Sequence, residues 1–457
     1  MKHRSIFVIF LLVGLGFSSC RLGRVHKTPE MDLPSAFDRQ GFSDGVAADI
    51  GWSTLYQDTV LQGLIEQALE YNKDVNIAAA RIREMIARKR IKFADMLPGL
   101  GVDVLAEREY LNYGGKEKEY DPEIHANLTF AWELDIWGNL RWQNEAAVAA
   151  YLQSVEAKRA LQLTIISQVA RMYFELNALD RELAIVRQTL GARREAVRFA
   201  TLRYEGGLTS EVPYRQSLVE LARTETLVPK LENEIKLKEN DLSVLLGEFP
   251  SSIPRGGAAG QKVLQELPVE LPSTLLQRRP DVRQAEQQLR AANAQVGVAY
   301  TNMFPRISLT ASLGGENSEL SHFLQSPAWY WGGKLVGPLF QMGRNRAAHR
   351  AAQAAYEQEV LRYEKKVLEV FQEVDNALET FRRTREMHVS AEALYRSAQS
   401  YEKLAHLQYV NGAVSYIDVL DAQRQLFDAQ IALNDAELNE LTATVSLYKA
   451  LGGGLIK

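Results

Sequence analysis

Apolar residues recur at alternating steps of four and three along a proline-free stretch in the first half of the chain. The stretch runs from about residue 138 to residue 204, and its one interior glycine is Gly191. The apolar positions are Ile165, Val169, Met172, Leu176, Leu179, Leu183, Val186 and Leu190. Such steps form the heptad pattern of a coiled coil. At 1.5 Å per residue the pattern predicts a helix of roughly 100 Å. A compact globule of this chain length has a radius of gyration of only about 23 Å, so we expect a rod or part of one.

Four shorter segments alternate between apolar and polar residues, which is the pattern of a strand with one apolar face. They are residues 100–110, 125–134, 306–314 and, with poorer alternation, a segment near 328–340. Five of the six tryptophans lie in or beside these segments, namely Trp132, Trp137, Trp142, Trp329 and Trp331. Strands of this kind with aromatic residues at the rim are typical of membrane barrels. A small soluble sheet with one buried face has the same pattern.

The chain is a tandem duplication. When the sequence is shifted by 205 residues, Gly138 aligns with Gly343, and the matches continue without a gap until Leu246-Gly247 aligns with Leu451-Gly452. A shift of 207 residues aligns the parts of the two copies that lie upstream of this span. The two-residue difference predicts a variable loop between about 106 and 138. Each copy is predicted to contain a helix, two strands, a long helix, a turn and a helix. The predicted domains are a signal peptide (1–20), an N-terminal linker (21–52), a first repeat (53–247), a linker (248–262) and a second repeat (263–457).

Four strands cannot close a membrane barrel by themselves, because the smallest membrane barrels have about eight. An open sheet edge in lipid leaves backbone groups unpaired at several kcal/mol each. If the strands span a membrane, several chains must therefore share one barrel. Strand number alone permits a dimer with eight strands or a trimer with twelve.

The N-terminus has the pattern of a secretory signal. It has a basic start, an apolar run from Ile6 to Phe17 and a small-residue approach to Cys20, the only cysteine in the chain. The sequence FSSC resembles the lipobox of bacterial lipoproteins, which predicts lipidation of Cys20. The net charge of -4 gives no electrostatic case for nucleic-acid binding.

Residues 409–423, YVNGAVSYIDVLDAQ, predict two helices that meet at a turn. Asn411-Gly412 is the turn signal, because both residue types tolerate positive φ. Asp418 and Asp421 follow with i, i+3 spacing, which places two carboxylates on one helix face. Ser415 and Asp418 also have the spacing of a capping box, which explains Asp418 without any further role. The corresponding turn of the first copy contains Gly207.

These features together resemble the outer-membrane factors of tripartite efflux pumps, the TolC/OprM family, in its NodT-type lipoprotein branch. The most specific part is residues 275–314, and residues 51–78, 338–378 and 410–430 also fit. The resemblance implies a mainly helical protein with membrane β structure: a coiled-coil helical barrel and a shared twelve-stranded transmembrane β-barrel built by a homotrimer. It implies an outer-membrane location, with a lipid anchor at Cys20 and a helical tunnel in the periplasm. The implied partners are a periplasmic adaptor, an inner-membrane RND-type pump and outer-membrane lipid.

The resemblance also assigns a periplasmic gate. It places Asp418 and Asp421 at the mouth of the tunnel, where three chains would form an acidic ring, and Tyr409 where the family holds the closed tip. The hypothesis is that the ring binds or selects cations, and that its close carboxylates raise one another's pKa. The first copy has Pro213 in place of Asp418, and Val414 stands where some members have a clamping arginine.

Two other classes of protein share part of this pattern, whereas the motifs of common enzymes are absent. The sequence has no phosphate loop, GxSxG or HExxH motif, and its histidines show no metal-ligand spacing, so we expect neither catalysis nor a cofactor. The alternatives left open are a periplasm-spanning coiled-coil structural lipoprotein and an exit duct for type I protein secretion. A tether would not need alternating strands at matched places in both copies. A passive duct takes its specificity from the pump that docks on it, so the channel sequence assigns no substrate.

Overall fold

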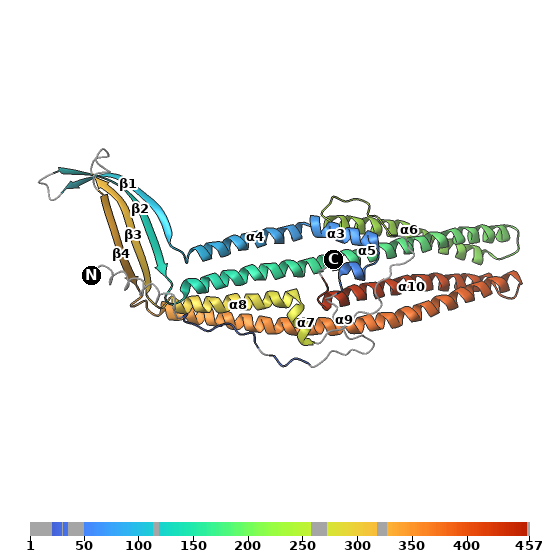
Figure 1. Ribbon diagram of the computed structural model, residues 1–457. Coiled ribbons are helices and arrows are strands. Elements are labelled where there is room, and N and C mark those ends of the chain that lie inside the picture. Colours follow the sequence, from blue (N-terminus) through green and yellow to red (C-terminus); the bar gives the residue numbers. More distant parts are fainter. Residues whose placement is uncertain are drawn as a thin grey trace. The chain divides into compact units, whose positions relative to one another are not determined.

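The computed structural model describes residues 21–29, 31–34, 50–112, 118–256, 272–317 and 327–454 (Figure 1). The predicted signal peptide, with Cys20, lies outside these residues, as do parts of both predicted linkers. The chain forms two compact units, one of residues 1–31, 80–156 and 283–365 and one of residues 32–79, 157–282 and 366–457. Each unit contains part of both repeats, so the compact units do not coincide with the predicted domains.

The helices show the duplication directly. Helix α4 (Lys73–Ala94) and helix α8 (Pro280–Thr301) each have 22 residues. Helix α5 (Asn139–Glu205) and helix α9 (Arg344–Val410) each have 67 residues, and helix α6 (Glu211–Leu245) and helix α10 (Tyr416–Ala450) each have 35. The first pair starts at residues 73 and 280 and the second at 139 and 344, which reproduces the predicted shifts of 207 and 205. The tandem duplication is confirmed.

The first unit contains one antiparallel sheet in the order β1-β2-β3-β4. Its strands are β1 (Gly99–Asn112), β2 (Lys118–Leu134), β3 (Arg306–Asn317) and β4 (Pro327–Val336). All four predicted strands are present, but β1 and β2 extend into the segment predicted as a variable loop, and they stay paired as far as Asn112 opposite Lys118. Ladder hydrogen bonds join backbone groups, so the hairpin continues where apolar alternation has stopped.

The register of the strands gathers the apolar residues on one face. Val102 lies opposite Leu128, Leu128 opposite Leu313, and Leu313 opposite Trp329, so one apolar row crosses all four strands. A parallel row contains Leu100, Phe130, Ala311 and Trp331. Val102, Leu313 and Trp329 are 75%, 62% and 72% exposed in the single chain. A contiguous apolar face of this kind marks a membrane or protein contact.

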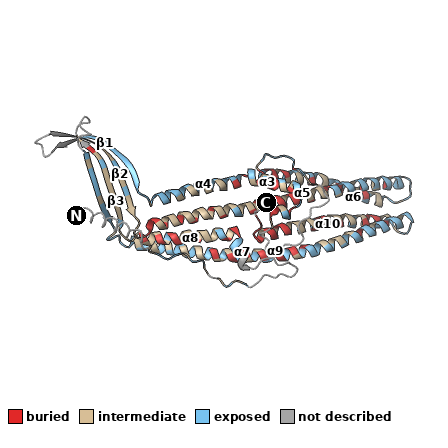
Figure 2. Ribbon diagram, viewed as in Figure 1, coloured by how far each residue is buried: buried red, intermediate tan, exposed pale blue. Residues whose placement is uncertain are grey.

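The second unit holds the heptad positions of α5. Ile165, Val169, Leu176, Leu183 and Val186 are all buried (Figure 2). Leu183 and Val186 pack against Leu231 of α6, with Phe427 of α10 beside them. The short helices α2 (Trp52–Leu55), α3 (Thr59–Tyr71) and α7 (Pro272–Arg278) complete this unit. Among the described residues, none of these or the longer helices has an apolar stretch sufficient to cross a bilayer.

Candidate functional site

The two helix hairpins of the second unit end in the same turn. In the α5–α6 turn, Gly207 adopts φ +68°, and in the α9–α10 turn Gly412 adopts φ +74°. The N–H of Gly412 donates to the carbonyl of Tyr409 at 2.9 Å, and the N–H of Ala413 donates to Gln408 at 2.8 Å. These two bonds define a Schellman motif, which needs a residue with positive φ at this point. Asn411, which the sequence offered as a second such residue, does not adopt positive φ.

The first predicted gate residue, Asp418, is the third residue of α10 and forms a capping box with Ser415, the N-cap residue. Its carboxylate accepts hydrogen bonds from the N–H and the hydroxyl of Ser415, both at 2.8 Å, and the capping box predicted from the spacing is present. The Ser415 hydroxyl and backbone N–H lower the pKa of Asp418. The carboxylate is fully exposed at the start of α10, so capping leaves it accessible to solvent.

The second predicted gate residue, Asp421, forms an ion pair within its own helix. Its two carboxylate oxygens accept from Arg424 at 2.5 Å and from Gln425 at 2.7 Å. The side chains of Asp421 and Arg424 are both partly exposed, and helix pairs at this spacing contribute only about 0.2–0.5 kcal/mol. The two carboxylates predicted on one face therefore have different partners: Asp418 bonds to Ser415, the N-cap residue, and Asp421 bonds to Arg424.

Tyr409 contacts the other hairpin. Its hydroxyl accepts a hydrogen bond from Arg203 of α5 at 2.7 Å, although the two residues are 206 positions apart. The ring of Tyr409 also lies 5.5 Å from the ring of Tyr416, at the start of α10. In the first copy Tyr204 stacks on Tyr214 at 5.6 Å in a corresponding place. Tyr409 thus joins α9, α10 and the end of α5.

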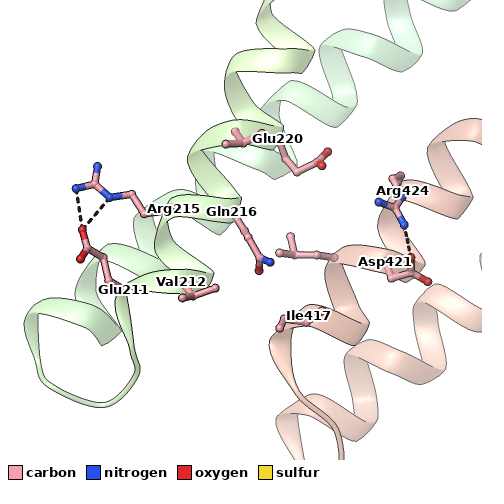
Figure 3. Close-up of a pocket in the computed structure, with 10 residues that line it drawn as sticks. Glu211, Val212, Arg215, Gln216, Glu220, Ile417, Asp421 and Arg424 are labelled. Carbon is pink, nitrogen blue, oxygen red and sulfur yellow. Dashed lines mark hydrogen bonds and ion pairs between the residues drawn. The ribbon is translucent and has the colours of Figure 1, made fainter.

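A groove of about 470 Å³ lies between α6 and α10 next to these turns. Figure 3 shows Gln216 of α6 projecting toward α10, with an ion pair on each wall, Glu211–Arg215 and Asp421–Arg424. Apolar side chains line the groove between the charges, namely Val212, Val219, Ile417 and Leu420. Three of the four are exposed, so the groove offers an apolar floor with charged rims.

A buried cation lies where α5, α6 and α10 meet. The side chain of Arg193 is only 4% exposed, and it lies 3.6 Å from the carboxylate of Glu220. It also donates to Gln423 of α10 at 3.3 Å. Burial lowers its pKa, and the charge of Glu220 opposes this effect. Because losing one partner of a buried pair costs several kcal/mol, Arg193 holds the second-copy hairpin against the first.

Sequence reasoning proposed Asp418, Asp421, Tyr409, Gly207 and Gly412 as site residues. It predicted Ser415 as the partner of Asp418 but missed Arg424 and Arg203. Arg424 had a readable signal, because arginine three residues after an acid on a helix forms a pair. Arg193 and Arg203 had none, because their partners lie on other helices. Among the described residues no group of three or more His, Cys, Asp or Glu side chains is placed to hold a metal ion.

Comparison with known proteins identifies the class of this fold. The family described as outer membrane efflux protein matches residues 64–248 and again residues 271–453. Cation efflux system protein CusC of Escherichia coli is 32% identical over 97% of this chain and 97% of its own. Probable outer membrane lipoprotein SilC of Salmonella typhimurium is 30% identical over 100% of this chain and 99% of its own. The MtrE outer membrane channel of Neisseria gonorrhoeae, solved in its open state, has a TM-score of 0.88 at 27% identity, covering 95% of this chain and 99% of that one.

The duplicated helices and the four-stranded sheet are those of an outer-membrane efflux channel. The chain belongs to the outer membrane efflux protein family, so the predicted resemblance to the TolC/OprM type is confirmed. Its function as an outer-membrane channel subunit of the tripartite efflux type is likewise confirmed. The roles predicted for individual residues stay predictions.

Proposed function

We propose that three copies of the chain assemble into one exit duct, each giving four strands to a twelve-stranded barrel. The observation that carries this proposal is the apolar row that crosses all four strands and is exposed in the single chain. Strands β1 and β4 each have one neighbour in the described sheet, and an unpaired edge in lipid costs several kcal/mol per group. Pairing β4 of one copy with β1 of the next gives both edges a partner and so removes the free-energy cost of each unpaired edge.

The membrane attachment that we propose has two parts, the barrel and acyl chains on Cys20. The lipobox-like sequence FSSC supports the second part, as does a relative named as an outer membrane lipoprotein. The periplasmic adaptor and the inner-membrane RND-type pump are the proposed partners. Relatives are named for efflux of cations and of toluene, so these names do not select one substrate for this chain. We propose no catalytic role.

The groove between α6 and α10 is the proposed contact for the adaptor. Its apolar floor includes Val212, Val219 and Ile417, all exposed in the single chain. The charged rims give such a contact polar ends. A helix with apolar residues at i, i+3 and i+4 fits a groove of this composition.

The proposed gate consists of Asp418, Asp421 and Tyr409 from each of the three copies. The carboxylate of Asp418 is fixed by Ser415 and fully exposed. Asp421 is held by Arg424, which offsets part of its charge. A ring built from these residues attracts cations through six carboxylates, and rings of this kind select cations in other pores.

Single-channel recording in planar bilayers tests this function. We expect the purified chain to conduct, and di- or trivalent cations added at the periplasmic side to block the current. Replacing both Asp418→Asn and Asp421→Asn removes the charges while keeping an acceptor for the cap. The half-blocking concentration should then rise about ten-fold, which is the ratio for a loss of about 1.4 kcal/mol.

Glu84→Gln is the matched control, because Glu84 is an exposed acid of α4 that pairs with Arg88 in its own helix and belongs to the first unit. Its block should equal that of the unaltered chain. No conductance at all would contradict the channel and favour a structural tether. If the double variant conducts but its half-blocking cation concentration is unchanged, the proposed gate is contradicted and the channel is not. Isolation from membranes with identification of the bound inner-membrane protein separates efflux from type I secretion.

A further inference from the structure

The first residues after Cys20 contact the first unit at several points. The N–H of Leu22 donates to the carbonyl of Trp137 at 3.2 Å, and the indole N–H of Trp142 donates to the carbonyl of Leu22 at 2.7 Å. Further along, Asn293 donates to the carbonyl of Arg24 at 3.1 Å. Residues 21–27, which we call the strap, were predicted as part of a linker. Their backbone groups bond to α5, to α8 and to the segment between β2 and α5.

The strap fits against Trp142 because two glycines leave room for the indole. Trp142 is 1% exposed. A Cβ on Gly23 of the strap would lie 2.7 Å from the indole, and Gly23 has φ +123°, which other residues rarely adopt. A Cβ on Gly297 of α8 would also collide with the same ring. The indole is thus enclosed by one glycine from the strap and one from the helix that the strap crosses.

Electrostatic contacts hold the start of the strap in the same place. The guanidinium of Arg21 lies 3.3 Å from the centre of the Trp142 ring and forms an ion pair with Glu145 of α5. Arg290 of α8 lies 3.6 Å from the other carboxylate oxygen of Glu145. A cation over an indole contributes about 0.5–2 kcal/mol depending on its exposure.

The strap contact lies at the helical end of the sheet. Trp137 lies three residues after the end of β2 and donates from its indole to the carbonyl of Pro305, the residue before β3. Its ring stacks on Phe304 at 5.2 Å. Aromatic residues gathered at the end of membrane strands mark the level of the lipid head groups.

We propose that the strap is a docked element with Trp142 as its receptor, which fixes the lipid anchor beside the ends of β2 and β3. This inference rests on the proposed lipidation of Cys20. Consecutive Cα atoms are about 3.8 Å apart, so Arg21 limits where Cys20 can lie. If the segment after Cys20 were the flexible linker of about thirty residues that the sequence predicted, its root-mean-square end-to-end length would be about 30 Å, and it would restrict the anchor far less. Docking therefore commits the acyl chains to the leaflet that borders the helical end of the sheet.

A spin label at Val25→Cys tests the inference in the full chain, reconstituted in phosphatidylethanolamine and phosphatidylglycerol vesicles. Val25 is 76% exposed, and Cys20 is the only natural cysteine, so with Cys20 acylated the label has one site. We expect an immobilised label at head-group depth, and slow hydrogen exchange at the Leu22 amide. In the Gly23→Val background the label should become mobile and the Leu22 amide should exchange at least ten-fold faster.

The matched control is Gly191→Val, because nothing lies within 4 Å of a Cβ at Gly191. Arg21→Gln, which keeps the backbone and removes the cation, should give an intermediate loss of protection. A label equally mobile with and without Gly23→Val would overturn the inference. Mass analysis of the N-terminal peptide gives a separate result. An unmodified Cys20 would contradict the proposed lipid anchor, whereas the protection of Leu22 would still decide whether the strap is docked.

Discussion

Glycine serves two opposite purposes in the helical hairpins. Gly412 ends α9 with φ +74°, a conformation that an L residue with a side chain adopts at a cost of roughly 1–2 kcal/mol. Gly191 lies inside α5 and has no positive φ. A Cβ would have open space at both positions. The backbone alone therefore decides the effect of adding one.

Gly191→Ala should stabilise the hairpin by about 0.8–1 kcal/mol, because alanine loses less conformational entropy in a helix. Gly412→Ala should destabilise the turn by about 1 kcal/mol, because the methyl group is strained at positive φ. Hydrogen exchange of amides around each site measures the free energy of local opening. Changes of the same sign at the two positions would contradict this interpretation.

Residue-level prediction succeeded where the partner lies a few positions away. The capping box of Ser415 and Asp418 and the turn at Gly412 follow from spacing and backbone preference. The contact of Arg203 with Tyr409 could not be predicted in this way, because it joins residues 206 positions apart. No local pattern specifies a partner that only the packing of two hairpins brings near.

At the scale of elements, the strap contains a histidine in an unfavourable place for its charge. His26 is half-buried, and among the described residues neither ring nitrogen has a hydrogen-bond partner. Burial lowers its pKa, while the charges of Glu286 and Glu145 raise it and that of Arg290 lowers it. The net pKa lies below the ordinary value of 6.5. The docked strap therefore binds fewer protons than a released one.

Docking of the strap should accordingly weaken as the pH falls below about 6.5. A depressed histidine pKa gives stability that is present above the ordinary pKa and lost on acidification. The label at Val25→Cys should be more mobile at pH 5 than at pH 7.5. His26→Gln should remove this difference, and a pH effect that persists in this variant would assign it to another group.

Whole elements were predictable to the extent that periodicity specifies them. The heptad steps predicted α5, and the alternation predicted the strands. The strap could not be predicted, because its contact depends on the space around Trp142 that Gly297 of a distant helix leaves. The full lengths of β1 and β2 were also missed, because ladder pairing does not require apolar alternation.

At the scale of the whole chain, one charged cluster joins helices α8, α9 and α10 in the second unit. Arg279, which follows α7 and is buried, donates to Asp281 of α8 at 2.8 Å, to Glu373 of α9 at 2.6 Å and to the carbonyl of Ala450 in α10 at 2.5 Å. Lys366 lies 2.9 Å from Asp281. Burial raises the pKa of Asp281, but the hydrogen bonds and charges of Arg279 and Lys366 outweigh it and hold that pKa well below its usual range.

Asp281→Asn should lower the free energy of unfolding by about 2–3 kcal/mol at pH 7, because it leaves two cations with one acid fewer. A depressed carboxyl pKa gives stability that is complete above the ordinary value near 4 and is lost only below it. The difference between the variant and the unaltered chain should therefore shrink below about pH 4.

Urea unfolding in detergent, followed by tryptophan fluorescence, measures both effects. Asp95→Asn is the control, because Asp95 pairs with Lys92 on the exposed surface and such pairs contribute little. A control loss as large as that of Asp281→Asn would contradict a special role for the cluster.

The two outer strands, β1 and β4, have a genetic consequence. A subunit whose β4 edge cannot pair leaves the β1 edge of its neighbour unpaired as well. One defective subunit therefore prevents closure of the barrel that it joins. With three copies per ring, as proposed, a cell expressing sound and faulty subunits equally retains about one intact ring in eight if assembly is random. Alleles that damage a strand edge should therefore be dominant, whereas alleles that prevent folding altogether should be recessive.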